Sequence, residues 1–155
     1  MTARPALAAL VAASVLALLV AYGLQHLGGL RPCHFCLLER WPYGGIALFG
    51  GIALGFRFDT LGLALAALLL LGEAGLALYH VGIEAGVFQL SAGCIAGSGA
   101  GSVAELKAQM MNAPPTCDQV TARLFGLSLA AWNAIFALVL LFLATMTLAW
   151  DYFRR

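Results

Sequence analysis

Four long hydrophobic stretches, separated by polar segments, dominate the pattern of the chain. They cover residues 5–24, 41–56, 60–79 and 127–150. A helix needs roughly 20 apolar residues to cross the hydrocarbon of a bilayer, and only the second stretch falls clearly short of that length. No alternation of apolar and polar positions indicates a transmembrane barrel. The pattern therefore predicts an all-α membrane protein, a four-transmembrane-helix bundle in a single domain over residues 1–155.

The edges of the first two stretches refine this prediction. The first stretch follows Arg4 as in a signal peptide, but it is longer than the usual apolar region and has no clear cleavage site. We therefore expect it to remain as the first helix. The second stretch is expected to take in Leu37 and Leu38. This extension brings the charged pair Glu39 and Arg40 to the membrane interface.

Four crossings place both chain ends on one side of the membrane and the loops 25–40 and 80–126 on the other. All four cysteines of the sequence fall in these two loops. Disulfides persist only outside the reducing cytosol, so the loops are expected to face the outer compartment and the termini the cytoplasm. The positively charged pair Arg154 and Arg155 favours the same orientation.

The composition agrees with a membrane protein and argues against other classes. Of the 155 residues, 63% are hydrophobic and only 10% are charged. A soluble domain is typically about half apolar and about a quarter charged. The net charge of +1 gives no electrostatic reason to expect a nucleic-acid partner.

The long loop 80–126 contains two further predicted elements. Residues 96–102 consist of glycine, serine and alanine, a composition typical of a flexible hinge. Apolar residues then recur at helical spacing, at Val103, Leu106, Met110 and Met111. They predict a short interfacial helix that lies on the membrane surface.

A Cys-x-x-Cys pair, Cys33 and Cys36, carries the clearest chemical signal because it stands just before the second helix. The partial positive charge of a helix N-terminus stabilises a thiolate, which is the reactive form of cysteine. With Arg40 one turn further along, Cys36 is expected to have a lowered thiol pKa. Arg40 can also stabilise the negative charge that develops on a quinone during reduction.

The other two cysteines, Cys94 and Cys117, are separated by the hinge of the long loop. A disulfide across such a loop is open to attack, which suits thiol exchange better than bracing. The four cysteines together predict a relay. In this relay an external dithiol reduces the loop pair, the loop thiols reduce Cys33 and Cys36, and these pass two electrons to a membrane quinone.

Several segments resemble a known family. They are Pro32-Cys33-His34-Phe35-Cys36 followed by Glu39-Arg40-Trp41-Pro42-Tyr43, Tyr79-His80 ahead of Cys94, Cys117-Asp118, and residues 125–133. In these segments, and in the order of its crossings and cysteine pairs, the chain resembles the bacterial disulfide bond formation protein B (DsbB) family. The resemblance covers nearly the whole chain. It implies a multi-pass protein of the bacterial inner membrane with both cysteine loops in the periplasm.

The resemblance also implies a role for each cysteine. Cys94 would form the mixed disulfide with a DsbA-type periplasmic protein of the thioredoxin fold, and Cys117 would be its mate. Cys33 would receive the attack of the loop thiols. Cys36 would face the quinone, which is either ubiquinone or menaquinone.

On the quinone side, the resemblance implies Arg40 as the cation and His80 as a histidine near the quinone head. Both residues have plainer explanations, because Arg40 can snorkel to the lipid headgroups and His80 can be an interfacial residue. Glu73 lies deep within the third stretch, where a carboxylate is costly and usually functional. It either supplies a proton route to the quinone or is a neutral acid that bonds a neighbouring helix.

Three alternatives compete with the relay. Vitamin K epoxide reductase proteins also join a Cys-x-x-Cys pair to a quinone, though their motif order differs from the one found here. A non-catalytic membrane protein would use the cysteines as structural disulfides, although closing the short ring between Cys33 and Cys36 stabilises little. A zinc site formed by all four cysteines is disfavoured, because structural zinc usually uses two closely spaced pairs. We therefore expect no metal.

Overall fold

The computed structural model describes residues 3–89, 94, 102–104, 107 and 115–154, and over these ranges the chain is mostly helical. Within them, three helices are long and apolar enough to cross a membrane. They are α1 (Ala3–His26), α5 (Asp59–Glu84) and α7 (Leu129–Phe153). These helices correspond to the first, third and fourth hydrophobic stretches.

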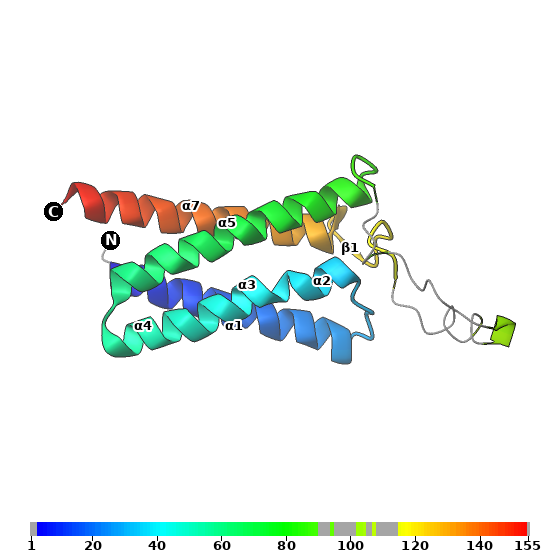
Figure 1. Cartoon of the computed structure of the whole chain (residues 1–155), viewed down its shortest axis with the longest axis horizontal. Helices are drawn as coiled ribbons and strands as arrows, with labels where there is room; N and C mark the ends of the chain where they lie inside the picture. Colours follow the sequence, from blue (N-terminus) through cyan, green and yellow to red (C-terminus); the bar gives the residue numbers. More distant parts are fainter. Residues whose placement is uncertain (1–2, 90–93, 95–101, 105–106, 108–114, 155) are drawn as a thin grey trace.

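The second hydrophobic stretch forms a helical rod that is broken into several pieces. The pieces are α2 (His34–Leu38), α3 (Arg40–Gly45), the π-helix η1 (Ile46–Gly50) and α4 (Gly51–Phe56). Figure 1 shows the rod running alongside α1. Pro42 has no backbone N–H to donate, and glycines recur between residues 44 and 51, so this segment departs from a regular α-helix.

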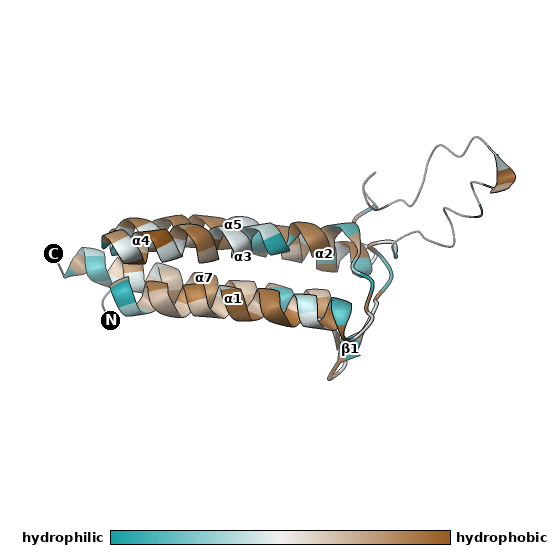
Figure 2. Cartoon of the chain, turned by 90° about the horizontal axis from the view of Figure 1, so that it is seen from below, coloured by the Kyte–Doolittle hydropathy of each residue, from teal (hydrophilic) through white to brown (hydrophobic). Residues whose placement is uncertain are grey.

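The two chain ends lie at the same end of the bundle, and the cysteine-bearing segments lie at the opposite end (Figure 1). At the terminal end the chain turns back tightly. Arg57 ends α4 in the left-handed region with φ 62°, and α5 begins two residues later at Asp59. Figure 2 shows apolar residues along most of the length of the helices and hydrophilic residues towards their ends.

Helix α5 supplies the centre of the buried core and packs against α7. Leu63, Leu70 and Ala77 follow one another at intervals of seven residues, and all three are fully buried. Helix α7 contributes small buried residues, Ala130, Ala134, Ala137 and Ala144. Small side chains let two membrane helices approach closely. The resulting van der Waals packing stabilises the helix pair in lipid, where the hydrophobic effect does not drive helices together.

Helix α5 continues beyond the predicted end of the third stretch. The hydrophobic pattern ends at Tyr79, whereas the helix runs on to Glu84. It stops just before Gly86, which adopts φ 72°, a left-handed conformation that glycine reaches at little cost. His80 is therefore a buried helical residue rather than the first residue of the loop.

A small hairpin leads into α7. Its strands β1 (Arg123–Leu124) and β2 (Leu127–Ser128) pair antiparallel. Phe125 and Gly126 form the turn with φ of 50° and 84°, positive values of the kind that two-residue hairpin turns require. Ser128 then caps α7, because its side-chain oxygen accepts a 3.1 Å hydrogen bond from a backbone N–H of the first turn.

The two predictions for the long loop fall mostly outside the described residues. The hinge at 96–102 overlaps them at Ser102 alone. Of the four apolar positions of the expected interfacial helix, Val103 is described, and Leu106, Met110 and Met111 are not. Both elements stay predictions.

Candidate functional site

Cys33 and Cys36 lie at the cysteine end of the bundle as a pair of free thiols. Cys33 caps α2, and its sulfur accepts a 3.2 Å hydrogen bond from the backbone N–H of Cys36. Only 2% of Cys33 is exposed, whereas Cys36 is half-buried. Local backbone geometry therefore holds one sulfur of the pair inside the protein.

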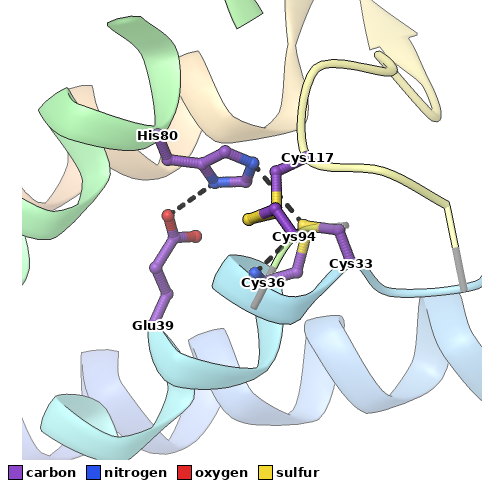
Figure 3. Close-up of a disulfide and its surroundings, with 6 residues drawn as sticks. All are labelled: Cys33, Cys36, Glu39, His80, Cys94 and Cys117. Carbon is purple, nitrogen blue, oxygen red and sulfur yellow. Dashed lines mark hydrogen bonds and ion pairs between the residues drawn. A yellow bond between two sulfur atoms is a disulfide. The ribbon is translucent and has the colours of Figure 1, made fainter. Parts of the chain in front are cut away.

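The other two cysteines, Cys94 and Cys117, are joined by a disulfide. Both are buried in a hydrophobic cluster that also contains Cys33 and Phe35. Figure 3 shows the disulfide beside Cys33 and Cys36, so that all four sulfur atoms gather in one place. This is the pairing that the family resemblance implies, and it removes both loop cysteines as ligands for the zinc alternative.

His80 of α5 connects Cys33 to a buried carboxyl group. Its Nε2 atom lies 3.5 Å from the Cys33 sulfur, and its Nδ1 atom lies 2.8 Å from Oε1 of Glu39. Figure 3 shows the imidazole reaching from α5 towards both groups. His80 is 2% exposed and Glu39 is 6% exposed. The sequence pointed to His80 only as a neighbour of the quinone, and its contact with Cys33 is a new finding.

Asn133 of α7 links this cluster to the middle of the bundle. Its amide nitrogen donates to Oε2 of Glu39 at 3.1 Å and to Oε1 of Glu73 at 2.8 Å. Its oxygen accepts a 2.8 Å hydrogen bond from the hydroxyl of Tyr43. Glu73 is completely buried, and its bond to α7 agrees with the second of the two explanations above, in which it bonds a neighbouring helix.

Hydrogen bonding makes the two thiols of the pair unequal. The side chain of Cys36 bonds to the Cys33 sulfur and, helped by His80, lowers the pKa of the Cys33 thiol to about 4 against the opposing effect of burial. The same contact with Cys33, together with burial, raises the pKa of Cys36 above its ordinary value. The sequence-based prediction of a lowered pKa at Cys36 is wrong, because the hydrogen bond to the Cys33 sulfur and burial both raise the pKa of Cys36. A thiolate at Cys33 also disfavours a second negative charge beside it.

Glu39 lies at the junction of α2 and α3. Burial raises the pKa of its carboxyl group, while the hydrogen bonds from His80 and Asn133 act in the opposite direction. Each carboxyl oxygen receives one of these two bonds. A carboxylate bonded at both oxygens is held in one orientation, so Glu39 is a fixed partner for the imidazole.

A cavity of about 370 Å³ lies beside the dithiol. Cys36, Arg40 and His80, the three residues expected on the quinone side, all line it, and Cys33 lines it as well. An apolar wall comes from α1 and α7, at Leu16, Ala17, Val20, Ala21, Leu24, Ala130 and Phe136. A concave apolar space with a few convergent polar groups is typical of a small-molecule site.

Arg40 is fixed in this cavity by contacts with α1. One terminal nitrogen donates a 2.7 Å hydrogen bond to Gln25, and the guanidinium carbon lies 4.6 Å from the centre of the Tyr22 ring. Its Nε atom is buried and has no hydrogen-bond partner among the described residues. An unpaired buried donor is costly, so this N–H suits a ligand that brings an acceptor oxygen. A lipid-soluble quinone fits both this donor and the apolar wall.

The donor atoms of Cys33, Cys36 and His80 lie within 4.8 Å of one another, a spacing that a soft cation could bridge. Structural zinc takes four ligands, however, and the two loop cysteines are bonded to each other. Metal binding would also occupy both thiolates that a disulfide at this position needs. The donor set therefore suits redox chemistry better than a structural metal.

The sequence did not identify the residues that hold the site together. It indicated Glu39 only as an interfacial charge, and it gave Asn133 and Tyr43 no role. One signal was present, because Asn133 is a polar residue inside an apolar stretch, and such residues often bond a neighbouring membrane helix. The helix that would face it could not be read from the pattern.

A buried dithiol next to a disulfide, at one end of a bundle of membrane-length helices, defines the class of membrane-bound disulfide oxidoreductases. Within that class the chain belongs to the DsbB family, since the sequence model described as "Disulfide bond formation protein DsbB" matches residues 3–147. The chain is 33% identical over 148 residues to a disulfide bond formation protein B of Herminiimonas arsenicoxydans, covering 88% of this chain and 89% of that protein. It is 29% identical over 155 residues to a protein of the same name from Marinobacter nauticus, covering 94% and 90%. No solved structure matches the chain.

Proposed function

We propose that the protein reoxidises a DsbA-type thiol oxidase of the periplasm and passes the electrons to a membrane quinone. The observation that carries this proposal is the position of the dithiol. Cys33 shares a buried cluster with the Cys94–Cys117 disulfide, and both Cys33 and Cys36 line the cavity that contains Arg40. The pair thus borders a second redox centre and a small-molecule site at once.

The proposed electron path follows the order of the sulfur atoms. A thiolate of the reduced partner attacks Cys94, forms a mixed disulfide and releases Cys117. The partner's second thiol resolves this mixed disulfide, which leaves the partner oxidised and the loop pair reduced. The loop thiols then attack a Cys33–Cys36 disulfide at Cys33, and Cys36 leaves on the cavity side. Each exchange moves two electrons and conserves the number of S–S bonds.

The inequality of the two thiols supports this direction of flow. A lowered pKa at Cys33 stabilises the reduced pair at neutral pH. Stabilising the reduced form makes a dithiol pair a stronger oxidant, and a DsbA-type partner already has a potential of roughly −120 mV. The hydrogen bonds at Cys33 therefore shift the pair towards the high potential that an oxidant of such a partner needs.

The cavity residues match a quinone in their chemistry. Arg40 offers a buried N–H without a partner among the described residues, and its charge is complementary to the charge of a ring undergoing reduction. Cys36 and His80 lie on the same cavity. When bound, ubiquinone or menaquinone would supply an acceptor for two electrons and two protons.

The proposed function requires an inner-membrane location with the cysteines on the periplasmic side. We infer that residues 41–56 of the helical rod are the second crossing and complete a four-helix bundle, since the rod runs beside α1 and turns directly into α5 (Figure 1). The termini then face the cytoplasm, and both cysteine loops face the compartment in which disulfides persist.

The test is quinone reduction by the purified full-length protein in detergent, driven by a reduced DsbA-type partner. We expect turnover that disappears in Cys36→Ser and persists in Asp151→Asn, a charge-removing control near the C-terminus. Ubiquinone and menaquinone are tested separately. Absence of turnover with both, in protein shown to be folded and oxidised, would instead indicate structural disulfides in a non-catalytic protein.

A further inference from the structure

Cys33, His80 and Glu39 stand in the order of a nucleophile, a base and an orienting carboxylate. We propose that they form a proton relay, in which His80 takes and returns the proton of the Cys33 thiol and Glu39 fixes the imidazole tautomer that can do so. This role differs from contact with the quinone head, which the family resemblance implies for His80. The relay depends on the proposed function in one respect, because the reaction that the relay serves is the oxidation of the Cys33–Cys36 dithiol.

The ionisation of Glu39 determines which nitrogen of His80 carries hydrogen. An ionised Glu39 has no proton to donate, so Nδ1, 2.8 Å from its Oε1 atom, is the donor of that hydrogen bond. Nε2 then faces the Cys33 sulfur at 3.5 Å. It accepts the proton of the thiol in one state and donates it to the thiolate in the other. Enzymes that activate a serine or a cysteine use a histidine between nucleophile and carboxylate in this way.

The two assisting residues have different roles. His80 contacts the reacting sulfur and is therefore a catalytic residue. Glu39 acts through His80 and is a positioning residue. Its second oxygen accepts a 3.1 Å hydrogen bond from Asn133, so the carboxylate cannot rotate away from the imidazole without breaking a bond to another helix.

Other titratable and polar groups among the described residues surround the His80 imidazole. Cys36 stands next to Cys33 in the pair, and the Cys94–Cys117 disulfide does not titrate. Helix α7 presents the uncharged amide of Asn133. Further charged groups of the described residues line the cavity, at Arg31, Arg40 and Glu84, or lie on α5, at Asp59 and Glu73, and Tyr43 is another titratable residue of the cavity. Because Glu39 is the carboxylate in contact with the imidazole, we expect it to govern the protonation of His80.

The relay accounts for the protons of dithiol oxidation. Forming the Cys33–Cys36 bond removes two electrons and two protons from the two thiols. His80 holds the proton of Cys33 while this sulfur reacts as a thiolate, and Cys36 loses its own proton as the bond forms. The quinone of the proposed function takes both electrons and both protons and leaves as quinol, so His80 returns to its neutral form.

The test is a pH titration of thiolate ultraviolet absorbance in reduced full-length protein that carries Cys94→Ser and Cys117→Ser. Only the Cys33–Cys36 pair then contributes, and a further Cys33→Ser change identifies the midpoint of Cys33 by abolishing it. His80→Gln is expected to raise this midpoint by about one to three pH units, the range for loss of a nearby cationic partner. Glu39→Gln keeps the size of the side chain but removes its charge, and it is expected to raise the midpoint by less.

His26→Gln is the matched control, because His26 stacks on Tyr22 at the end of α1 and is expected to leave the midpoint unchanged. A midpoint in His80→Gln equal to that of the control overturns the relay. If size-exclusion chromatography shows that His80→Gln does not fold, Glu39→Gln decides the matter, and an unchanged midpoint there overturns the relay.

The titration needs neither a quinone nor a partner protein. A raised midpoint in protein without quinone turnover would therefore support the relay and contradict the proposed function. Turnover with an unchanged midpoint would support the proposed function and contradict the relay.

Discussion

Asn133 donates a 3.1 Å hydrogen bond to Glu39, a residue 94 positions earlier in the chain. This bond joins α7 to the junction of α2 and α3, next to the dithiol. Through Glu39 the network continues to His80 and Cys33, and through the same amide nitrogen it reaches Glu73. One uncharged side chain thus connects the reactive thiol with the buried centre of the bundle.

Replacing Asn133 with alanine is expected to destabilise the protein by about 1–3 kcal/mol, because buried oxygen atoms of Glu39 and Glu73 lose their donor. Thermal unfolding in detergent, followed by circular dichroism, measures the change. Thr145→Val is the matched control on the same helix, since the Thr145 hydroxyl donates to carbonyl oxygens of its own helix. Equal melting temperatures for the two variants would show that the network adds nothing to stability.

The pH dependence of the reduction potential of the Cys33–Cys36 pair is expected to report the proton held by His80. The pKa of Cys33 is lowered to about 4, so above this value its thiol is already ionised in the reduced pair. The raised pKa of Cys36 keeps the second thiol protonated. Reduction then places one proton on Cys36 and, through the relay, one on His80, and the potential should fall by about 60 mV per pH unit between roughly pH 5 and 8. A couple that takes up one proton would fall half as steeply.

Equilibration of the pair with a redox buffer of known potential, in protein carrying Cys94→Ser and Cys117→Ser, measures this slope. His80→Gln is expected to lower the potential by about 30 mV for each unit by which it raises the pKa of Cys33, since the reduced form loses that stabilisation. A slope of about 30 mV per pH unit in the parent protein would mean that His80 does not hold the proton of Cys33 in the reduced pair.

Loss of Gln25 is expected to weaken quinone binding without changing thiol chemistry. Gln25 accepts a 2.7 Å hydrogen bond from the Arg40 guanidinium and so orients it within the cavity. In Gln25→Ala the KM for quinone should rise by about tenfold, the effect of losing one hydrogen bond to a charged group. Steady-state kinetics in detergent would measure it, with His26→Gln as the control on the same turn of α1. A KM equal to that of the control would remove Gln25 from the site.

Glu73→Gln is expected to leave the pH dependence of quinone turnover unchanged. The side-chain oxygen of a glutamine at this position can still accept the 2.8 Å hydrogen bond that Asn133 donates, so the helix contact survives. Rates measured across the pH range in the variant and in the parent test this expectation. A displaced pH profile would revive the alternative in which Glu73 carries protons to the quinone.

The hydrophobic pattern was sufficient to predict the long helices and the gathering of the cysteines at one end. Both follow from segment length and from the number of crossings, which are properties of the sequence alone. It misplaced His80, because a hydropathy pattern ends at the first polar residues, whereas α5 ends at the left-handed Gly86. A buried polar residue at the end of a helix is therefore hard to separate from a loop residue.

The site itself depended on geometry that the sequence does not contain. A Cys-x-x-Cys motif next to a helix does not say which sulfur accepts the hydrogen bonds of the other thiol and of His80. The sequence assigned the lowered pKa to Cys36, whereas these bonds lower the pKa of Cys33 and raise that of Cys36. The partners of Glu39 come from α5 and α7, so they follow from the rotation of each helix about its axis. Composition and spacing leave that rotation open.

The most direct test of the central claim is a single turnover without any partner protein. Reduced protein carrying Cys94→Ser and Cys117→Ser is mixed with an equivalent of ubiquinone or menaquinone. Quinol is then measured by absorbance, and the free thiols at Cys33 and Cys36 are counted by alkylation and mass spectrometry. We predict that a Cys33–Cys36 disulfide forms for each quinol produced, and that Cys36→Ser produces neither. Quinone that stays oxidised while both thiols stay free would contradict the account.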